Sequence, residues 1–173
     1  MAKDGYILSI DQGTTSSRAL IFADNGQILS QKNYEFTQFY PKNGWVEHDP
    51  IEIFDTTVKA IKFVITDSNI DPKDISVAGI TNQRETVVVW DKISGKPIHN
   101  AIVWQDRRTE EICEKLRKDG FSESITKKTG LIIDPYFSGT KIKWILENVP
   151  EAKNKLDSGN LIIGTIDTWL IWN

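Results

Sequence analysis

The apolar residues in the first part of the chain fall in short runs that predict β-strands. One run covers residues 6–10, a second covers 19–23 and a third covers 28–36. The last two runs flank Asp24-Asn25-Gly26, and an Asn-Gly pair tolerates the positive φ angles that tight hairpin turns require. The pattern therefore predicts three antiparallel strands in sequence order, followed by a loop over residues 37–48.

A helical period replaces this pattern after residue 48. Asp49 is a typical N-cap, Pro50 suits the first helical position, and Glu52 has the spacing to complete a capping box. Apolar residues then recur at helical spacing and predict the face that packs on the sheet: Ile51, Phe54, Val58, Ile61 and Ile65.

Strands and helices alternate in the remainder of the chain. Strands are predicted at residues 75–81, 86–90, 101–104 and 161–163, the first of them a buried type because it is apolar and β-branched. Helices are predicted at residues 108–118, 122–129 and 138–148, with Gly130 as a C-terminal residue of the second. Strands followed by a β/α alternation indicate an α/β fold, with a mixed β-sheet and helices packed on it.

Composition narrows the possible partners and the compartment. The chain has 173 residues and a formal net charge of −3, without a block of like charge, so no nucleic-acid partner is expected. No apolar stretch is long enough to span a bilayer, so no membrane insertion is expected. The single cysteine, Cys113, excludes an intramolecular disulfide and indicates a reducing, cytoplasmic compartment. The last residues form an apolar run behind Asp167, a candidate N-cap, and so we expect a fragment of a longer protein.

Residues 11–18 (DQGTTSSR) are the first candidate site. Asp11 at a strand end is a suitable ligand for a hard cation such as Mg²⁺. Gly13 would let a backbone approach phosphate oxygens, and the donors for them would be Thr14, Thr15, Ser16 and Arg18. The simpler interpretation, which this stretch alone favours, is a hairpin with a polar turn. The loop has neither the lysine nor the glycine spacing of a Walker A motif.

Three further stretches carry candidate ligands for a polyhydroxyl compound. Arg84 and Glu85 lie between two apolar strands and could donate to and accept from hydroxyl groups, although a solvated turn explains them equally simply. Neighbours on a regular strand point to opposite faces, so these two can share a ligand only if the backbone is irregular there. Trp104 is either a core residue or an indole wall for C–H groups. Tyr136, which follows a proline, offers a hydroxyl, with core packing as the alternative.

Other chemistries have no support in the sequence. His48 and His99 are far apart and lack the cysteine or carboxylate spacing of a zinc site. The G-x-S-x-G elbow of serine hydrolases is missing.

Taken together, these stretches resemble the FGGY carbohydrate kinases. The resemblance covers the whole chain and includes residues 11–18, 44–50 (GWVEHDP) and 136–148 (YFSGTKIKWILEN). Residues 82–86 (NQRET) and 104–108 (WQDRR) are similar to the members of this family that phosphorylate glycerol, whereas xylulose kinases carry a different segment at the first of these places.

The resemblance implies an actin-like ATPase fold of the ribonuclease H type, with residues 1–173 forming most of the N-terminal domain and the C-terminal domain lying outside this chain. It implies ATP- and Mg²⁺-dependent phosphorylation of glycerol to glycerol 3-phosphate by a full-length homo-oligomer. By position, the nucleotide-phosphate contacts would be Thr14, Thr15, Ser16 and Arg18, and Asp11 would be the Mg²⁺ ligand. The glycerol ligands would be Arg84, Glu85 and Tyr136, with Trp104 as an apolar wall.

The catalytic base and the adenine pocket would lie beyond Asn173, so this chain alone is expected to be inactive. Two alternatives stay open: another polyol or sugar kinase of the family, and a non-catalytic nucleotide-binding protein of the actin-like fold, such as a chaperone or filament protein.

Overall fold

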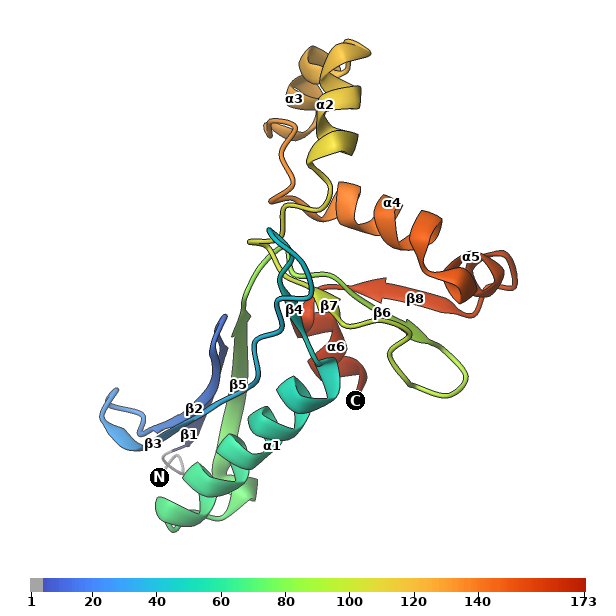
Figure 1. Cartoon of the computed structure of the whole chain (residues 1–173). Coiled ribbons are helices and arrows are strands. Elements are labelled where there is room, and N and C mark those ends of the chain that lie inside the picture. Colours follow the sequence, from blue (N-terminus) through green and yellow to red (C-terminus); the bar gives the residue numbers. More distant parts are fainter. Residues whose placement is uncertain (1–4) are drawn as a thin grey trace. The chain divides into compact units, whose positions relative to one another are not determined.

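A computed structural model describes residues 5–173 as a mixed α/β structure (Figure 1). The chain divides into two compact units. The first unit contains the described residues up to Thr37, together with Asp49–Gln83 and Ile166–Asn173; the second contains Gln38–His48 and Arg84–Thr165. No helix within residues 5–173 combines the length and the apolar character needed to cross a membrane.

The first unit is built on a four-stranded mixed sheet in the order β3-β2-β1-β5. Its strands are β1 (Tyr6–Gln12), β2 (Ser16–Phe22), β3 (Ile28–Glu35) and β5 (Ile75–Asn82). The β1–β2 and β2–β3 pairs are antiparallel, and β5 runs parallel to β1. Gly26 has a φ of 84° in the β2–β3 turn, which is why the Asn-Gly pair suits this position. The predicted three-strand meander is therefore confirmed.

Helix α1 (Pro50–Asp67) packs against the β1–β3 part of this sheet (Figure 1). The Asp49 carboxylate accepts a hydrogen bond from the backbone N–H of Ile51 at 2.8 Å, which confirms the predicted N-cap. The capping box is wrong: Glu52 Oε1 instead accepts from the backbone N–H and the hydroxyl of Thr37, each at 3.1 Å. Glu52 thus ties the chain leaving β3 to the start of the helix.

The buried face of α1 differs from the predicted one. The helix buries Ile53, Thr57, Ala60 and Val64 besides Pro50, and the last two pack with Leu8, Ile10, Ala19 and Ile21 of the sheet. Ile51 is 45% exposed, while Ile61 and Ile65 are half-buried at the edge of this core. The spacing of apolar residues did not predict the buried face correctly, because this face includes the polar residue Thr57. Its hydroxyl is satisfied within the helix by the carbonyl oxygen of Ile53 at 2.8 Å.

The strand β5 is exposed, against the prediction of a buried strand. It follows a short 3-10 helix, η1 (Pro72–Asp74), and forms one edge of the sheet. Val77 is 53% exposed and Ile80 is 38% exposed. Apolar, β-branched residues favour a strand that can be buried, but they do not show whether another part of the protein covers that strand.

Helix α6 (Ile166–Trp172) contacts β5 and α1 in the first unit. Trp169 is buried, and its indole N–H donates to the carbonyl oxygen of Pro50 at 2.8 Å. Asp167 lies within the first turn of α6 and is therefore not the N-cap that the sequence predicted.

The second unit contains two small sheets and four helices. Strand β4 (Glu47–His48) pairs with β7 (Ala101–Ile102), and β6 (Val88–Asp91) pairs with β8 (Leu161–Gly164), both antiparallel. The helices are α2 (Glu110–Lys118), α3 (Ser122–Thr129), α4 (Ser138–Asn148) and α5 (Pro150–Asp157). Gly130 ends α3 with a φ of 74°, as predicted, whereas β4 and α5 were not predicted. A core cluster joins β6, β7, α4 and α5: Val87, Val89, Ile102, Ile145, Val149 and Ala152.

Candidate functional site

The candidate phosphate loop is the turn between β1 and β2 in the first unit. Its backbone closes through a hydrogen bond from the N–H of Gly13 to the carbonyl oxygen of Ser16 at 2.9 Å. A Cβ atom on Gly13 would lie 3.2 Å from that same oxygen, so this tight turn favours glycine. Gln83, at the end of β5, braces the turn: its amide donates to Gln12 Oε1 and to the carbonyl oxygen of Gly13, each at 3.1 Å. Both glutamines are buried, and neither was predicted.

A polar hollow of about 330 Å³ adjoins this turn, and its lining residues are Asp11, Gly13, Ser16, Arg18 and Asn33. The strand register explains how they meet. Asp11 pairs with Arg18 across β1 and β2, and Arg18 pairs with Asn33 across β2 and β3, so the three side chains share one face of the sheet. Asp11 and Arg18 form an ion pair in this hollow.

The structure thus brings together Asp11, Ser16 and Arg18 of the predicted loop. Thr14 and Thr15 lie at the turn, Thr15 exposed, and neither lines the hollow. Asn33 was not predicted. The signal for it was available, because a polar residue opposite Arg18 follows from the register of the predicted hairpin.

The chemistry of this hollow suits a phosphate with a shared cation. Within residues 5–173 there is no group of three His, Cys, Asp or Glu side chains that could hold a metal ion. Mg²⁺, however, is commonly bound through one or two carboxylates together with the phosphates of a substrate. Asp11 is the carboxylate that lines this hollow, and it is paired with Arg18 there.

Glu85 is the central residue of the candidate polyol site in the second unit. Its φ of 66° places it in the left-handed region, which a side chain of this size rarely adopts. The irregular backbone that a shared ligand for Arg84 and Glu85 requires is therefore present. Glu85 Oε2 accepts from the backbone N–H of Ser138 at 2.8 Å and from its hydroxyl at 2.6 Å. Ser138 is the first residue of α4, and its hydroxyl serves Glu85.

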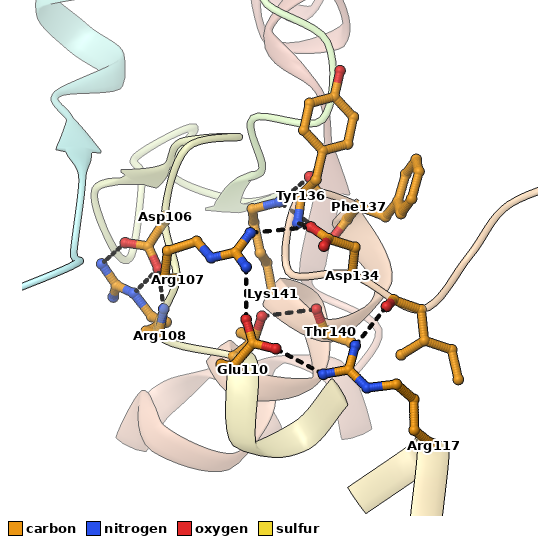
Figure 2. A network of polar contacts seen from close by, with 12 residues as sticks. Asp106, Arg107, Arg108, Glu110, Arg117, Asp134, Tyr136, Phe137, Thr140 and Lys141 are labelled. Carbon is orange, nitrogen blue, oxygen red and sulfur yellow. Dashed lines mark hydrogen bonds and ion pairs between the residues drawn. The ribbon is translucent and has the colours of Figure 1, made fainter. Parts of the chain in front are cut away.

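Two aromatic rings belong to the same region as this carboxylate, although they are distant from it in the sequence. The rings of Trp104 and Tyr136 pack edge to face with centroids 5.7 Å apart, and Tyr136 makes the same kind of contact with Phe137 at 5.1 Å. Figure 2 shows the rings of Tyr136 and Phe137 projecting away from a polar network. Since Tyr136 is two residues from Ser138, the structure brings Glu85, Trp104 and Tyr136 to one region, while Arg84 is exposed beside Glu85.

Buried charges support the segment that carries Trp104. Arg108 is 1% exposed at its side chain, and its Nη2 donates to Asp106 Oδ2 and to Glu47 Oε1, each at 2.8 Å. Its guanidinium lies 3.8 Å from the ring centroid of Trp45 and 4.7 Å from that of Trp144. Two carboxylates and two ring faces offset the desolvation of this charge.

Asp106 precedes α2 but does not cap it. It instead accepts from the backbone N–H of Val46 at 2.7 Å and from that of Arg108 at 2.8 Å, and Thr109 is the N-cap of α2. Asp106 and Arg108 therefore join residues 44–50 to residues 104–108, two of the stretches on which the family resemblance rests.

The comparisons with known proteins identify the family of this chain. Residues 6–173 match the FGGY family of carbohydrate kinases, N-terminal domain. The chain is 61% identical over all its 173 residues to a glycerol kinase of Thermoanaerobacter sp. (strain X514), and 57% identical over 168 residues, 97% of the chain, to glycerol kinase 2 of Thermotoga maritima. It spans 34% of the length of each of these relatives.

A crystal structure of Plasmodium falciparum glycerol kinase with ADP superposes with a TM-score of 0.91 at 43% identity. The match covers 98% of this chain and 34% of that structure. The fold is accordingly that of the sugar kinases of this family, a mixed α/β fold of the actin-like ATPase type. The chain belongs to the FGGY family of carbohydrate kinases.

Proposed function

We propose that the full-length protein containing this chain transfers the γ-phosphoryl group of ATP to glycerol and forms glycerol 3-phosphate. The observation that carries this proposal is the Glu85 site. The backbone of Glu85 is in the left-handed region, its carboxylate is held by Ser138, and Trp104 and Tyr136 belong to the same region. A short polyol needs hydrogen-bond acceptors for its hydroxyl groups and an apolar surface for its C–H groups, and these residues supply both. The 57–61% identity to glycerol kinases supports the choice of glycerol.

The hollow of the first unit would receive the nucleotide phosphates. Phosphoryl transfer depends mainly on positioning and on stabilising charge at the phosphate oxygens. Arg18 would donate charge-assisted hydrogen bonds, and the hydroxyl of Ser16 in the hollow would donate a neutral one. The hydroxyls of Thr14 and Thr15, which lie at the adjoining turn outside the hollow, would donate to phosphate oxygens that extend beyond it, and Asp11 would hold the cation. Mg²⁺, when bound, neutralises phosphate charge. Asn33 offers a further donor at the same hollow.

The second unit would bind and orient the polyol. Glu85 Oε2 is occupied by Ser138, whereas Oε1 has no hydrogen-bond partner within residues 5–173, which leaves an acceptor for a glycerol hydroxyl. Arg84 would donate to a hydroxyl oxygen, the phenol of Tyr136 would hydrogen-bond another, and Trp104 would face the carbon chain.

We further propose that residues 1–173 are most of an N-terminal domain, and that the catalytic base and the adenine pocket belong to the rest of the polypeptide. The share of 34% of the length of the relatives supports this division. A cytoplasmic location fits the free, buried Cys113. A homo-oligomer, which the family resemblance suggested, stays a prediction.

The test measures ADP release by the full-length protein with glycerol, xylulose and gluconate as acceptors. We expect glycerol to give the highest kcat/KM. A higher value with xylulose or gluconate would make the protein another sugar kinase of the family, and no acceptor-dependent release would favour the non-catalytic alternative.

A matched pair of variants then assigns the site. Glu85→Gln removes a charged acceptor, and we expect kcat/KM for glycerol to fall about 10- to 100-fold with little change in ATP binding. The control is Glu123→Gln, which removes an exposed carboxylate in the first turn of α3 in the same unit. Equal losses for glycerol and ATP in Glu85→Gln would make Glu85 a structural residue.

A further inference from the structure

Lys141 is a buried lysine that the proposed reaction does not use. It lies in α4 with 0% exposure and is among the largest fully buried side chains of the chain. Lysine is almost never fully buried unless it is paired, because removing an ammonium from water is costly. Its position therefore calls for a specific set of partners.

Those partners are backbone carbonyl groups of the polyol site. Lys141 Nζ donates to the carbonyl oxygen of Tyr136 and, at 3.2 Å, to that of Phe137 (Figure 2). On the other side, the backbone N–H of Tyr136 donates to Asp134 Oδ1 at 2.8 Å. The peptide groups on both sides of Tyr136 are thus held by charged side chains, which sets the direction in which its ring projects.

The same segment carries the clamp on Glu85. Ser138 directly follows Phe137, and both its backbone N–H and its hydroxyl donate to the Glu85 carboxylate. One ammonium group therefore anchors the turn from which Tyr136 reaches the site and from which Ser138 holds Glu85.

Asp134 extends this anchor to α2. Its Oδ1 also accepts from Arg107 Nη1 at 3.2 Å, and Arg107 pairs with Glu110 at 2.8 Å (Figure 2). Arg107 and Glu110 are half-exposed, so these pairs are screened by solvent and weak. Lys141, in contrast, is fully buried, and solvent does not screen its hydrogen bonds in this way.

We propose that Lys141 is a positioning residue for the polyol site, which orients Tyr136 and Glu85 through the backbone of residues 136–138. The inference rests on the proposed function, because it assigns a role within the same glycerol site. Lys141 does not touch the substrate, and its effect on glycerol is indirect.

The electrostatics of Lys141 provide a readout that simple loss of folding would not reproduce. Burial lowers the pKa of Lys141 from 10.5 to about 8, against the attraction of the acidic groups Glu85, Asp106 and Asp134, with the Cys113 thiol as a further titratable neighbour. Burial raises the pKa of that thiol, so it stays neutral near pH 8. Above pH 8 the Lys141 amine is therefore neutral, and its hydrogen bonds to the two carbonyl groups weaken.

The experiment uses the full-length protein and compares Lys141→Met and Lys141→Arg with Lys143→Met. Lys143 is two positions away on α4, half-exposed, and pairs with Glu147, so it is the matched control. We expect Lys141→Met to lower kcat/KM for glycerol by about 100-fold, because a small misplacement of the groups that bind a substrate has an effect of this size. The KM for ATP should stay nearly unchanged. Lys141→Arg, which keeps a charged donor, should recover part of the loss, and Lys143→Met should resemble wild type.

The pH profile decides the matter if Lys141→Met does not fold. In the wild type, KM for glycerol should rise about fivefold between pH 7 and pH 9, the difference between charged and neutral hydrogen bonds, while KM for ATP stays constant. In Lys141→Arg the KM for glycerol should not change over this range. A wild-type KM for glycerol that is flat from pH 7 to pH 9, or a folded Lys141→Met enzyme with wild-type kinetics, would overturn the proposal.

Hydrogen exchange separates this inference from the proposed function. We expect the amides of Tyr136, Phe137 and Ser138 to exchange faster in the wild type at pH 9 than at pH 7, beyond the rise of intrinsic exchange rates seen in Lys141→Arg. If the protein shows this loss of protection but does not phosphorylate glycerol, the function is wrong and Lys141 is still the anchor. Unchanged protection in an active glycerol kinase would mean that Lys141 does not hold the segment.

Discussion

Glu85 stores strain at the place where the proposed substrate binds. A non-glycine residue in the left-handed region costs free energy, and such residues persist where the surrounding structure holds them. Here the hold is the pair of hydrogen bonds from Ser138. The conformation turns the carboxylate away from regular strand geometry, which would have placed Arg84 and Glu85 on opposite faces.

This strain can be measured with two variants that both remove the carboxylate. Glu85→Gly and Glu85→Ala should lose glycerol phosphorylation equally, because neither has an acceptor. Glycine adopts the φ of 66° freely, so Glu85→Gly should be more stable than Glu85→Ala by about 1 kcal/mol in urea unfolding. Equal stabilities would show that the backbone at residue 85 relaxes on substitution.

His48 makes the second unit sensitive to acid. Its imidazole is fully buried in β4 beside Gln38 Oε1, at 2.6 Å, and burial lowers its pKa from 6.5 to about 4. Between these values the unfolded chain binds a proton at residue 48 and the folded chain does not. Stability that is complete above pH 6.5 is therefore lost as the pH falls towards 4.

We expect His48 to remove about 2 kcal/mol from the free energy of unfolding between pH 7 and pH 4.5. Replacement by His48→Gln, which does not titrate, should reduce the acid sensitivity by that amount, as measured by urea unfolding at both pH values. An unchanged pH dependence in this variant would place the acid-sensitive groups elsewhere.

Single residues were predictable where their chemistry is local. Asp11, Ser16 and Arg18 stand out in the sequence as polar residues at a turn, and the structure brings them to one hollow. Lys141 and Ser138 were missed as functional candidates because helical lysines and serines usually face water or cap a helix. Their roles come from partners outside their own helix or turn, which periodicity does not reveal.

At the scale of elements, the sequence determines where α1 begins more clearly than it determines which face of the helix is buried. Asp49 and Pro50 determine where the helix begins, through one side-chain hydrogen bond and one preset φ angle. The buried face depends instead on how closely the helix approaches the sheet. Ala60 and Thr57 lie against it together with Ile53 and Val64, whereas Ile51 lies outside this face.

The N-cap gives a direct test of this helix. Asp49→Ala should lower the free energy of unfolding by about 1 kcal/mol, since the N–H of Ile51 loses its acceptor. Asp55→Ala, an exposed substitution within α1, should stay within about 0.5 kcal/mol of wild type. A loss in Asp55→Ala as large as that in Asp49→Ala would indicate a general charge effect in place of capping.

At the scale of the whole molecule, the two compact units were not predictable from patterning. The first unit collects three separate parts of the chain, and α6 returns to it more than eighty residues after β5 ends. Such long-range returns follow from tertiary packing, for example the Trp169 hydrogen bond to Pro50, and leave no periodic signal in the sequence. The short motifs were informative because each can be recognised without knowing how distant parts of the chain pack together.

The division of the proposed site predicts how the chain behaves alone. Residues 1–173 supply candidate phosphate and polyol ligands but not the proposed base and adenine pocket. We therefore expect no glycerol-dependent ADP release from this chain in a coupled assay, with the full-length protein as the positive control. Turnover by the chain at the full-length rate would place the base within residues 1–173.

The exposed edge strand β5 has a practical consequence for any preparation of this chain. Its outer edge pairs with no other strand within residues 5–173, and its side chains include exposed valine and isoleucine. An unpaired, apolar edge is a template to which another extended segment adds through backbone hydrogen bonds. Concentrated solutions of the chain will therefore tend to self-associate through β5, and a lysine placed at Val77 is the simplest way to keep them monomeric.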